Sequence, residues 1–324
     1  TRPRAGPASG GMAGASAPGA AGSRRRPRCE LVALDGNGTL LGSDGETVSD
    51  RTRDVLKRVQ DLGIPCVLVT GRSLEKARPT LDRVGLREYV ITENGARALR
   101  IHDGQALYEQ WIDGAEAAEP LRRIRAKFGD AASFAQLTAD GGVIEESHPW
   151  LRLPEDCQAV ARNLFRHAVP DAAAAIAGGG ADARRCAKCY VTVPGSEDFE
   201  AVMREVQEAA GRGWKTRQIK QLLPGGSANT CEVQSEAVDK ADGLAALCVA
   251  VGKSMAGVWA FGDDLNDARM LREAGWGVRM ANHLPSLDGI GDDVTAGTND
   301  EDGVAAYLEE HLLADGPPGA ALAA

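Results

Sequence analysis

Near its start the chain alternates short apolar runs with a helical segment, and this order restricts the fold more than any other feature. Residues 31–34 and 65–69 are apolar runs of strand length. Between them, Ser49 is placed to cap a helix over residues 50–62, whose apolar side chains lie on one face. A strand, a helix and a second strand in this order predict a parallel βαβ unit.

The same order returns near the end of the chain. A helical stretch over residues 244–251 precedes a strand at residues 258–261 and a helix at residues 265–274. We therefore expect an α/β fold, with a Rossmann-like parallel sheet covered by helices and formed by residues 29–112 and 236–314.

The middle of the chain has a different pattern, in which helices and short strands are mixed. It predicts a separate α+β domain, inserted within the first, over residues 113–235. We expect this inserted domain to have helices at 115–128, 155–167 and 198–210 and strands at 190–193 and 230–233. Residues 171–183 are rich in Ala and Gly, and we expect them to be a surface insertion with little to pack.

The two ends of the chain contain few residues that a core could bury. Residues 1–28 hold six arginines and no acidic residue, which is typical of a disordered or targeting tail. Residues 315–324 are expected to be a flexible tail. We expect a cytoplasmic protein; a plastid or mitochondrial location is the alternative if residues 1–28 are a transit peptide.

Composition argues against two classes of partner. The 46 acidic residues exceed the 37 basic ones and give a formal charge of -9, which does not favour nucleic acid. The longest apolar stretches are far shorter than the ~20 residues that span a bilayer, so no membrane partner is expected. Seven cysteines, an odd number in a chain too large to need disulfides, indicate a reducing compartment.

Polar side chains follow three of the predicted strands, at the point where each strand ends. Asp35 and Thr70 follow the first two strands, and Asp263 and Asp267 follow the late one. The carboxyl ends of parallel strands meet at one edge of a sheet, so these carboxylates would repel one another unless a cation lay among them. Hard oxygen ligands favour Mg²⁺, and the sequence therefore predicts a magnesium site. The Thr70 hydroxyl, the glycine turns and Lys240 add donors for a phosphate beside this metal.

Six segments carry a resemblance to a known family. They are LVALDGNGTLL at 31–41, VLVTGR at 67–72, TENGA at 92–96, VDK at 238–240, FGDDLNDARML at 261–271 and NDEDGVA at 299–305. In this order they resemble the haloacid dehalogenase (HAD) superfamily, particularly the Cof-like phosphatases, which carry a mixed α/β cap between the second and third motifs.

The resemblance implies an Mg²⁺-dependent phosphatase that acts on a small phosphorylated metabolite of the sugar phosphate type. Asp35 would be the nucleophile that forms an aspartyl-phosphate. The implied phosphate-binding residues are Thr70, Gly71, Lys240 and Asn266. The implied metal ligands are Asp35, Asp263, Asp267 and the backbone carbonyl of Asn37.

Asn37 departs from the family pattern, which has a second Asp at this position to protonate the leaving oxygen and later activate water. A neutral amide does neither. Because general acid–base catalysis contributes roughly 10²–10⁴-fold, we expect a slowed phosphatase that prefers esters with good leaving groups. The alternative is a catalytically impaired HAD-fold protein that binds a phosphorylated small molecule in a regulatory role.

Other patterns in the sequence have simpler interpretations. Asp35 and Asn37 also match an EF-hand calcium loop, but its first ligand would then be Ala33, which has no side-chain oxygen. Cys186 and Cys189 form a CxxC, and on a regular strand their thiols would point to opposite faces, which favours packing over zinc. Two residues near the motifs have expected roles: Arg72 as a helix cap or substrate contact, and Asn94 as a left-handed turn residue.

Overall fold

The strand–helix–strand unit expected at the start of the chain is present in the computed structural model of the protein. β1 (Leu31–Asp35) and β2 (Cys66–Val69) are parallel neighbours connected through α1 (Asp50–Asp61). The Ser49 side chain accepts a hydrogen bond from the backbone N–H of Thr52 and so caps α1 as predicted. The structure describes residues 25–139, 141–152, 155–182, 184–193, 199–218 and 230–314.

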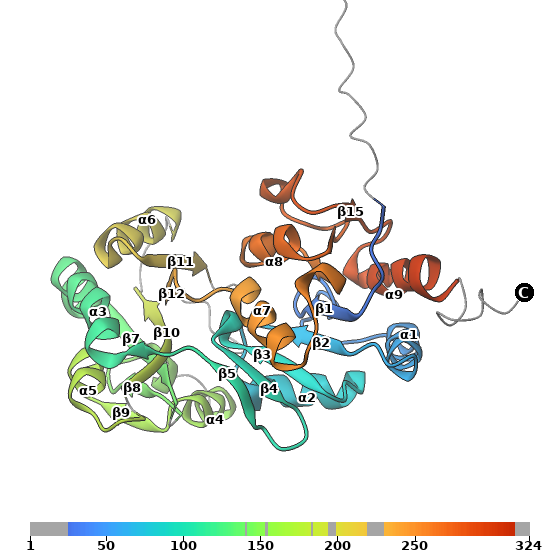
Figure 1. Cartoon of the computed structure of the whole chain (residues 1–324). Helices are drawn as coiled ribbons and strands as arrows, with labels where there is room; N and C mark the ends of the chain where they lie inside the picture. The colour runs from blue at the N-terminus through green and yellow to red at the C-terminus, as the bar shows by residue number, and fades with distance from the viewer. Residues whose placement is uncertain are drawn as a thin grey trace, which may run out of the picture.

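This unit belongs to an eight-stranded sheet with the order β15-β14-β13-β1-β2-β3-β4-β5 (Figure 1). Strands β15 to β3 are parallel, whereas β4 and β5 are antiparallel to their neighbours. The further strands are β3 (Tyr89–Thr92), β4 (Arg97–Arg100), β5 (Ala106–Glu109), β13 (Val258–Gly262), β14 (Trp276–Arg279) and β15 (Asp293–Val294). The prediction of a Rossmann-like parallel sheet is confirmed, with an antiparallel pair added at one edge.

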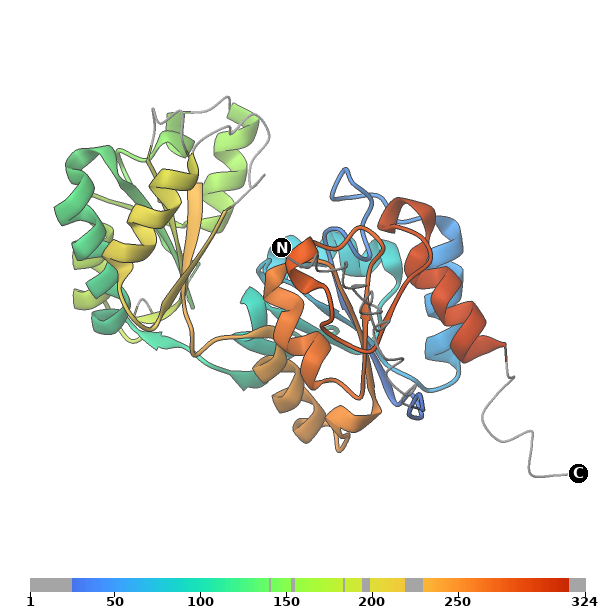
Figure 2. The same ribbon diagram turned by 90° about the horizontal axis from the view of Figure 1, so that it is seen from above.

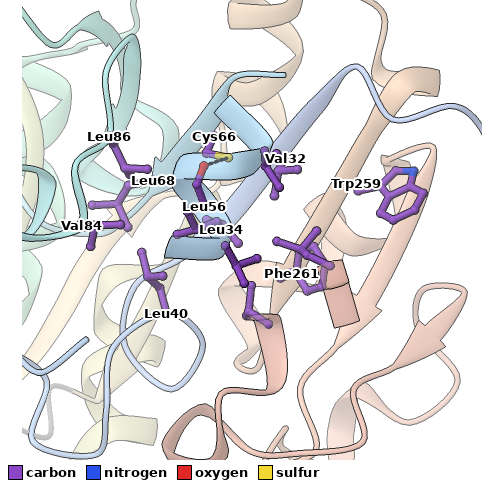
Figure 3. Packing of buried hydrophobic residues seen from close by; sticks show 14 of the residues in the cluster. Val32, Leu34, Leu40, Leu56, Cys66, Leu68, Val84, Leu86, Trp259 and Phe261 are labelled. Atoms are coloured by element: carbon purple, nitrogen blue, oxygen red, sulfur yellow. Dashed lines mark hydrogen bonds between the residues drawn. The ribbon is translucent and has the colours of Figure 1, made fainter. Parts of the chain in front are cut away.

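Helices cover both faces of this sheet because alternate side chains of each strand point to opposite sides. Val32 and Leu34 of β1 pack in the cluster that includes α1, α2 and α9, part of which Figure 3 shows. Leu31 and Ala33 pack in the cluster that includes α7 and α8. The bounds of these helices are α2 (Leu74–Val84), α7 (Lys240–Ala250), α8 (Ala268–Glu273) and α9 (Gly303–Leu308).

Short helical turns complete this lobe. They are η1 (Glu93–Gly95), η4 (Met255–Gly257), η5 (Leu265–Asp267), η6 (Pro285–Leu287), η7 (Asn299–Glu301) and the π-turn η8 (Glu309–Leu313). The helix predicted over residues 265–274 is present, with its first turn as the 3-10 helix η5 and the rest as α8, which ends at Glu273. The Asp267 side chain accepts hydrogen bonds from the backbone N–H groups of Asp263 and Asp264, which fixes this tight turn.

The residues between the two halves of this sheet form a second sheet, ordered β11-β12-β10-β7-β8-β9 with β6 paired to β10. Its strands are β6 (Ile112–Asp113), β7 (Ser133–Thr138), β8 (Val143–Glu145), β9 (His167–Val169), β10 (Arg185–Thr192), β11 (Trp214–Gln218) and β12 (Thr230–Ser235). Its helices and turns are α3 (Gly114–Phe128), η2 (Gly129–Ala131), η3 (Pro149–Arg152), α4 (Glu155–Leu164), α5 (Ala172–Gly178) and α6 (Phe199–Ala210). Figure 2 shows this lobe, the cap, beside the core lobe.

Residues 171–183 were expected to be an unpacked insertion, and this expectation is wrong. Ala172 and Ile176 of α5 are buried against α3, and the Asp171 side chain caps α5. A Cβ added to Gly114 of α3 would lie 2.1 Å from the carbonyl oxygen of Ile176, so only glycine permits this close approach. Small side chains let two helices approach closely and so pack well. A search of the sequence for large apolar residues does not detect this kind of packing.

Two further expectations for the cap need correction. The helix expected over residues 155–167 ends at Leu164, and His167 begins β9 instead. Cys186 and Cys189 lie on the same face of the sheet, within one apolar cluster, because a β-bulge between Cys186 and Lys188 shifts the alternation by one residue.

The described chain begins with residues that contact the core. The Arg26 guanidinium lies 5.1–5.6 Å from the centroids of three aromatic rings, those of Trp259, Trp276 and Tyr307. Arg26 and Pro27, whose carbonyl accepts from the Trp259 indole, therefore pack on the core, although they belong to the segment expected to be a tail. Residues 1–24 and 315–324, the rest of the two expected tails, lie outside the described residues. Across the described chain, no helix has both the length and the apolar character needed to span a membrane.

Candidate active site

The loop after β1 brings Asp35 against the loop after β13. Asp35 ends β1 and is 7% exposed. Gly38 has a φ of +79°, and a Cβ at this position would lie 2.2 Å from a carboxylate oxygen of Asp263. The Thr39 hydroxyl donates to Asp263 Oδ1 at 2.9 Å. Glycine at position 38 thus allows the two loops to touch, and Thr39 joins them.

Three carboxylates gather where these loops meet. Asp35, Asp263 and Asp267 each offer an oxygen, and these oxygens lie within 4.8 Å of one another. Burial and the charge of Asp35 raise the pKa of Asp263 to about 8 and that of Asp267 to about 6. A divalent cation fits this set, because the donors are hard carboxylate oxygens whose mutual repulsion it would relieve.

Lys240 lies among the same carboxylates. It opens α7, is 1% exposed, and its Nζ donates to Asp35 and, at 2.7 Å, to Asp267 Oδ1. Burial alone lowers the pKa of Lys240, but the charges of Asp267 and Asp35 outweigh it and raise this pKa. The lysine stays charged and links the nucleophile candidate to the β13 loop.

The other residues expected to bind phosphate lie around the loop after β2. Thr70 is buried, and its hydroxyl lies 3.7 Å from where a Cβ on Gly36 would be, beside the Asp35 loop. A Cβ on Gly71 would lie 2.7 Å from Asn94 Oδ1, the same oxygen to which Asn266 donates at 3.2 Å. The buried Asn266 Oδ1 has no hydrogen-bond partner among the described residues. The Thr70 hydroxyl accepts from the backbone N–H of Arg72 at 3.2 Å, so among these side chains Asn266 Oδ1 is the acceptor left without a partner in the described chain.

Asn37 is exposed, and Arg72 fixes its side chain. The Arg72 guanidinium donates to Asn37 Oδ1 at 2.8 Å, to the Gly45 carbonyl at 2.9 Å and to the Thr80 hydroxyl at 3.3 Å. Ser73, not Arg72, is the residue before α2. Arg72 thus holds the loop that carries Asn37, a role that neither expectation for Arg72 included.

Side chains of the cap also reach the loop after β2. Lys188 of β10 donates to the Gly71 carbonyl and to Glu232 Oε2 of β12, both at 2.6 Å. The Lys188 and Glu232 side chains are 2% and 4% exposed. Glu232 Oε1 accepts from Asn94 at 2.7 Å, and Asn94 has the left-handed conformation predicted for it, with φ 57°.

Sequence reasoning missed Lys188 and Glu232 because they belong to no motif. The one feature of the sequence that could have indicated them is a charged residue among mostly apolar neighbours in a strand, as for Lys188 within Arg185–Thr192. A pair of such residues in adjacent strands predicts a buried ion pair, but not what the pair faces.

A cavity of about 70 Å³ lies between the lobes, next to this network. Ser73 and Glu93 line it from the core, and Trp111 and Thr138 line it from the cap. Ser73 Oγ and Glu93 Oε2 are buried and have no hydrogen-bond partner among the described residues. Burial raises the pKa of Glu93 to about 7. The cavity is polar, and its volume allows water to satisfy these groups.

A parallel α/β core with carboxylates from two strand ends, a lysine between them and an inserted cap defines a hydrolase of the haloacid dehalogenase type. Residues 32–308 match the haloacid dehalogenase-like hydrolase family, and the chain belongs to that family. The predicted family and enzyme class are thereby confirmed.

Named relatives are phosphatases. Phosphatase YwpJ of Bacillus subtilis is 28% identical over 88% of this chain and 100% of its own length. The 5-amino-6-(5-phospho-D-ribitylamino)uracil phosphatase YcsE of the same organism is 28% identical over 88% of this chain and 96% of its own length. The structure of BT1666 from Bacteroides thetaiotaomicron is similar with a TM-score of 0.66 at 24% identity, over 90% of this chain and 98% of that one. This likeness concerns the fold.

Proposed function

We propose that the protein hydrolyses small phosphomonoesters of the sugar phosphate type through an aspartyl-phosphate on Asp35, with Mg²⁺ as cofactor. The observation that carries this proposal is the buried contact of Lys240 with Asp35 and Asp267, with Asp263 beside them. The relative YcsE is named for a phosphorylated ribityl compound, which supports a polyhydroxylated substrate.

The chain's own residues prepare Asp35 for attack on phosphorus. Lys240 neutralises charge beside Asp35, so that a dianionic ester can approach a carboxylate. Thr70 and the backbone N–H of Gly71 orient the phosphoryl oxygens. A carboxylate oxygen of Asp35 then bonds to phosphorus as the ester P–O bond breaks, and water later hydrolyses the aspartyl-phosphate.

Asp35, Asp263, Asp267 and the backbone carbonyl of Asn37 would hold the metal. When bound, Mg²⁺ supplies positive charge that offsets the repulsion between carboxylates and phosphate. Asn37 supplies no proton to the leaving oxygen, because it is an amide whose Oδ1 accepts from Arg72. Esters with good leaving groups are therefore the better substrates.

A pair of substrates tests the proposal. Purified protein is assayed with para-nitrophenyl phosphate and a hexose phosphate, with and without Mg²⁺, beside an Asp35→Asn control. We expect Mg²⁺-dependent phosphate release that favours the aryl ester and is lost in the control. Release that persists in Asp35→Asn would disprove the assigned nucleophile.

The alternative function is a non-catalytic one, in which the protein binds a phosphorylated small molecule in a regulatory role. The amide at position 37 is the observation that favours it. Wild-type protein that binds a phosphorylated metabolite with Mg²⁺ in calorimetry, and releases no phosphate from it or from the aryl ester, would support this alternative.

A further inference from the structure

Arg217 of β11 extends from the cap over the loop after β2. Its Nη2 lies 3.3 Å from the position that a Cβ on Gly71 would occupy. On its other sides, Glu232 Oε2 lies 3.9 Å away and Asp264 Oδ2 lies 3.8 Å away. The guanidinium thus lies where the cap, the loop after β2 and the loop after β13 meet.

Arg217 has unused hydrogen-bonding capacity, unlike the other cations around this loop. Its two carboxylate contacts exceed hydrogen-bond length, and its Nε is buried with no partner among the described residues. Lys188 instead bonds to Glu232 and Gly71 at 2.6 Å, and Lys240 bonds to Asp35 and Asp267. The Arg217 side chain is also 34% exposed, so a ligand between the lobes has access to it.

We propose that Arg217 contacts the substrate and stabilises the negative charge on the ester oxygen that leaves. This inference rests on the proposed function of Asp35. As a carboxylate oxygen of Asp35 bonds to phosphorus, the P–O ester bond breaks and its electron pair passes to the leaving oxygen. The Arg217 guanidinium donates hydrogen bonds to that oxygen without transferring its proton, and water then protonates the alkoxide.

Such a group is needed on the cap side of the loop after β2. A phosphoryl group in line with Asp35 directs its leaving oxygen away from Asp35, and the cap side chains of Arg217 and Lys188 reach Gly71 of that loop. Because Asn37 supplies no proton, charge develops fully on the leaving oxygen unless another group offsets it. Arg217 is the partly free cation in the described chain that is near enough to do so.

A series of aryl phosphates tests this role, since the leaving-group pKa varies along the series while the phosphoryl group stays the same. We compare Arg217→Met with wild type and with the matched control Arg123→Met, an exposed cap arginine that pairs with Glu119 on α3. For phenyl phosphate we expect Arg217→Met to lower kcat about 10²-fold, as for other lost transition-state donors. For dinitrophenyl phosphate, whose leaving group needs little stabilisation, we expect a much smaller loss. Arg217→Lys should recover part of the loss.

A steeper dependence of log kcat on leaving-group pKa in Arg217→Met supports the proposal, because misfolding would lower all the rates alike. Parallel dependences for the two proteins would overturn it. A second measurement does not require turnover: calorimetry with orthovanadate in Mg²⁺ buffer should show at least about tenfold weaker binding by Arg217→Met, and equal binding would refute the contact. Wild type that binds vanadate but hydrolyses no ester would count against the proposed function alone.

Discussion

The amide of Asn37 accepts a hydrogen bond from Arg72 at 2.8 Å, so a carboxylate placed there would lie beside a guanidinium. We expect Asn37→Asp to raise kcat for a hexose phosphate by roughly 100-fold, the low end of the range for general acid–base catalysis. The gain should shrink at higher pH, because Arg72 favours the ionised carboxylate and so weakens it as an acid. A pH profile of kcat for Asn37→Asp and Asn37→Ser checks this. Equal rates for wild type and Asn37→Asp would contradict it.

Lys240 neutralises two buried carboxylates, so we expect its removal to lower stability as well as activity. In metal-free protein, Lys240→Met leaves Asp35 and Asp267 without their cation, which for a broken buried pair costs about 3–5 kcal/mol. We expect added Mg²⁺ to recover part of this loss, because the ion binds the same carboxylates. Urea unfolding of both proteins, with Mg²⁺ and with a chelator, measures the two values. If Mg²⁺ does not reduce this loss of unfolding free energy, the ion does not bind these carboxylates.

The sequence places the residues of the core site well and those of the cap poorly. Asp35, Asp263 and Thr70 follow strands whose ends share one edge of a parallel sheet, so their meeting can be predicted from strand positions alone. Lys188 and Arg217 reach the same loop through the packing of one lobe on the other. That packing depends on side chains distant in sequence, for which no spacing rule exists.

Among elements, the loop after β13 should make the stability of the metal-free protein depend on pH. A bound metal ion should reverse this dependence. Burial and Asp35 raise the pKa of Asp263 to about 8, far above its value in an unfolded chain. Between about pH 4 and 8 the folded state then holds a proton that the unfolded state has lost, so the stability of metal-free protein falls as pH rises. Mg²⁺ favours the ionised form, and its stabilising effect should therefore grow over the same pH range.

Thermal unfolding at pH 5, 6, 7 and 8, with Mg²⁺ and with a chelator, measures this effect. We expect the difference in Tm between the two conditions to increase steadily with pH. Asp263→Asn has no carboxyl group with a raised pKa at this position. The Tm of the metal-free variant should therefore fall less with rising pH than that of the metal-free wild type. A Tm difference that is constant across this range would contradict the shared site.

β10 and β12 of the cap share a buried ion pair, Lys188–Glu232, whose side chains also bond to Gly71 and Asn94 of the core. Lys188→Met leaves the buried Glu232 carboxylate with only the Arg217 guanidinium, 3.9 Å away, as a cation, and we expect it to cost about 3–5 kcal/mol of unfolding free energy. The double variant Lys188→Met/Glu232→Leu removes both charges and should recover much of that loss. Urea denaturation of the single and double variants gives the coupling energy. Additive losses would mean that the two side chains do not interact.

Most elements follow from their periodicity, and the failures have identifiable causes. The pattern of α1 with its Ser49 cap is local, so it can be predicted to within a residue. α5 is built from alanines that pack only because Gly114 lets α3 approach, which is a property of two segments together. The β10 bulge between Cys186 and Lys188 likewise has no sign in the strand's own sequence.

For the whole molecule, the fold class can be predicted because βαβ order and connection handedness leave few alternatives. The relative placement of the two lobes cannot be predicted in this way, although it decides which cap side chains reach the loop after β2. Three charged cap side chains, those of Lys188, Arg217 and Glu232, lie at the loop that follows β2. The cap thus contacts the core through these side chains and, in the proposed function, would also surround the substrate.

The central claim is that Asp35 bonds covalently to phosphorus. We propose to mix the protein with para-nitrophenyl phosphate and Mg²⁺, quench it in acid within the first turnovers and locate the modified peptide by mass spectrometry. A phosphoryl group on Asp35 that is absent from Asp35→Asn and from chelator-treated protein is the predicted result. Phosphate release with no labelled Asp35, or a phosphoryl group on another residue, would contradict the account.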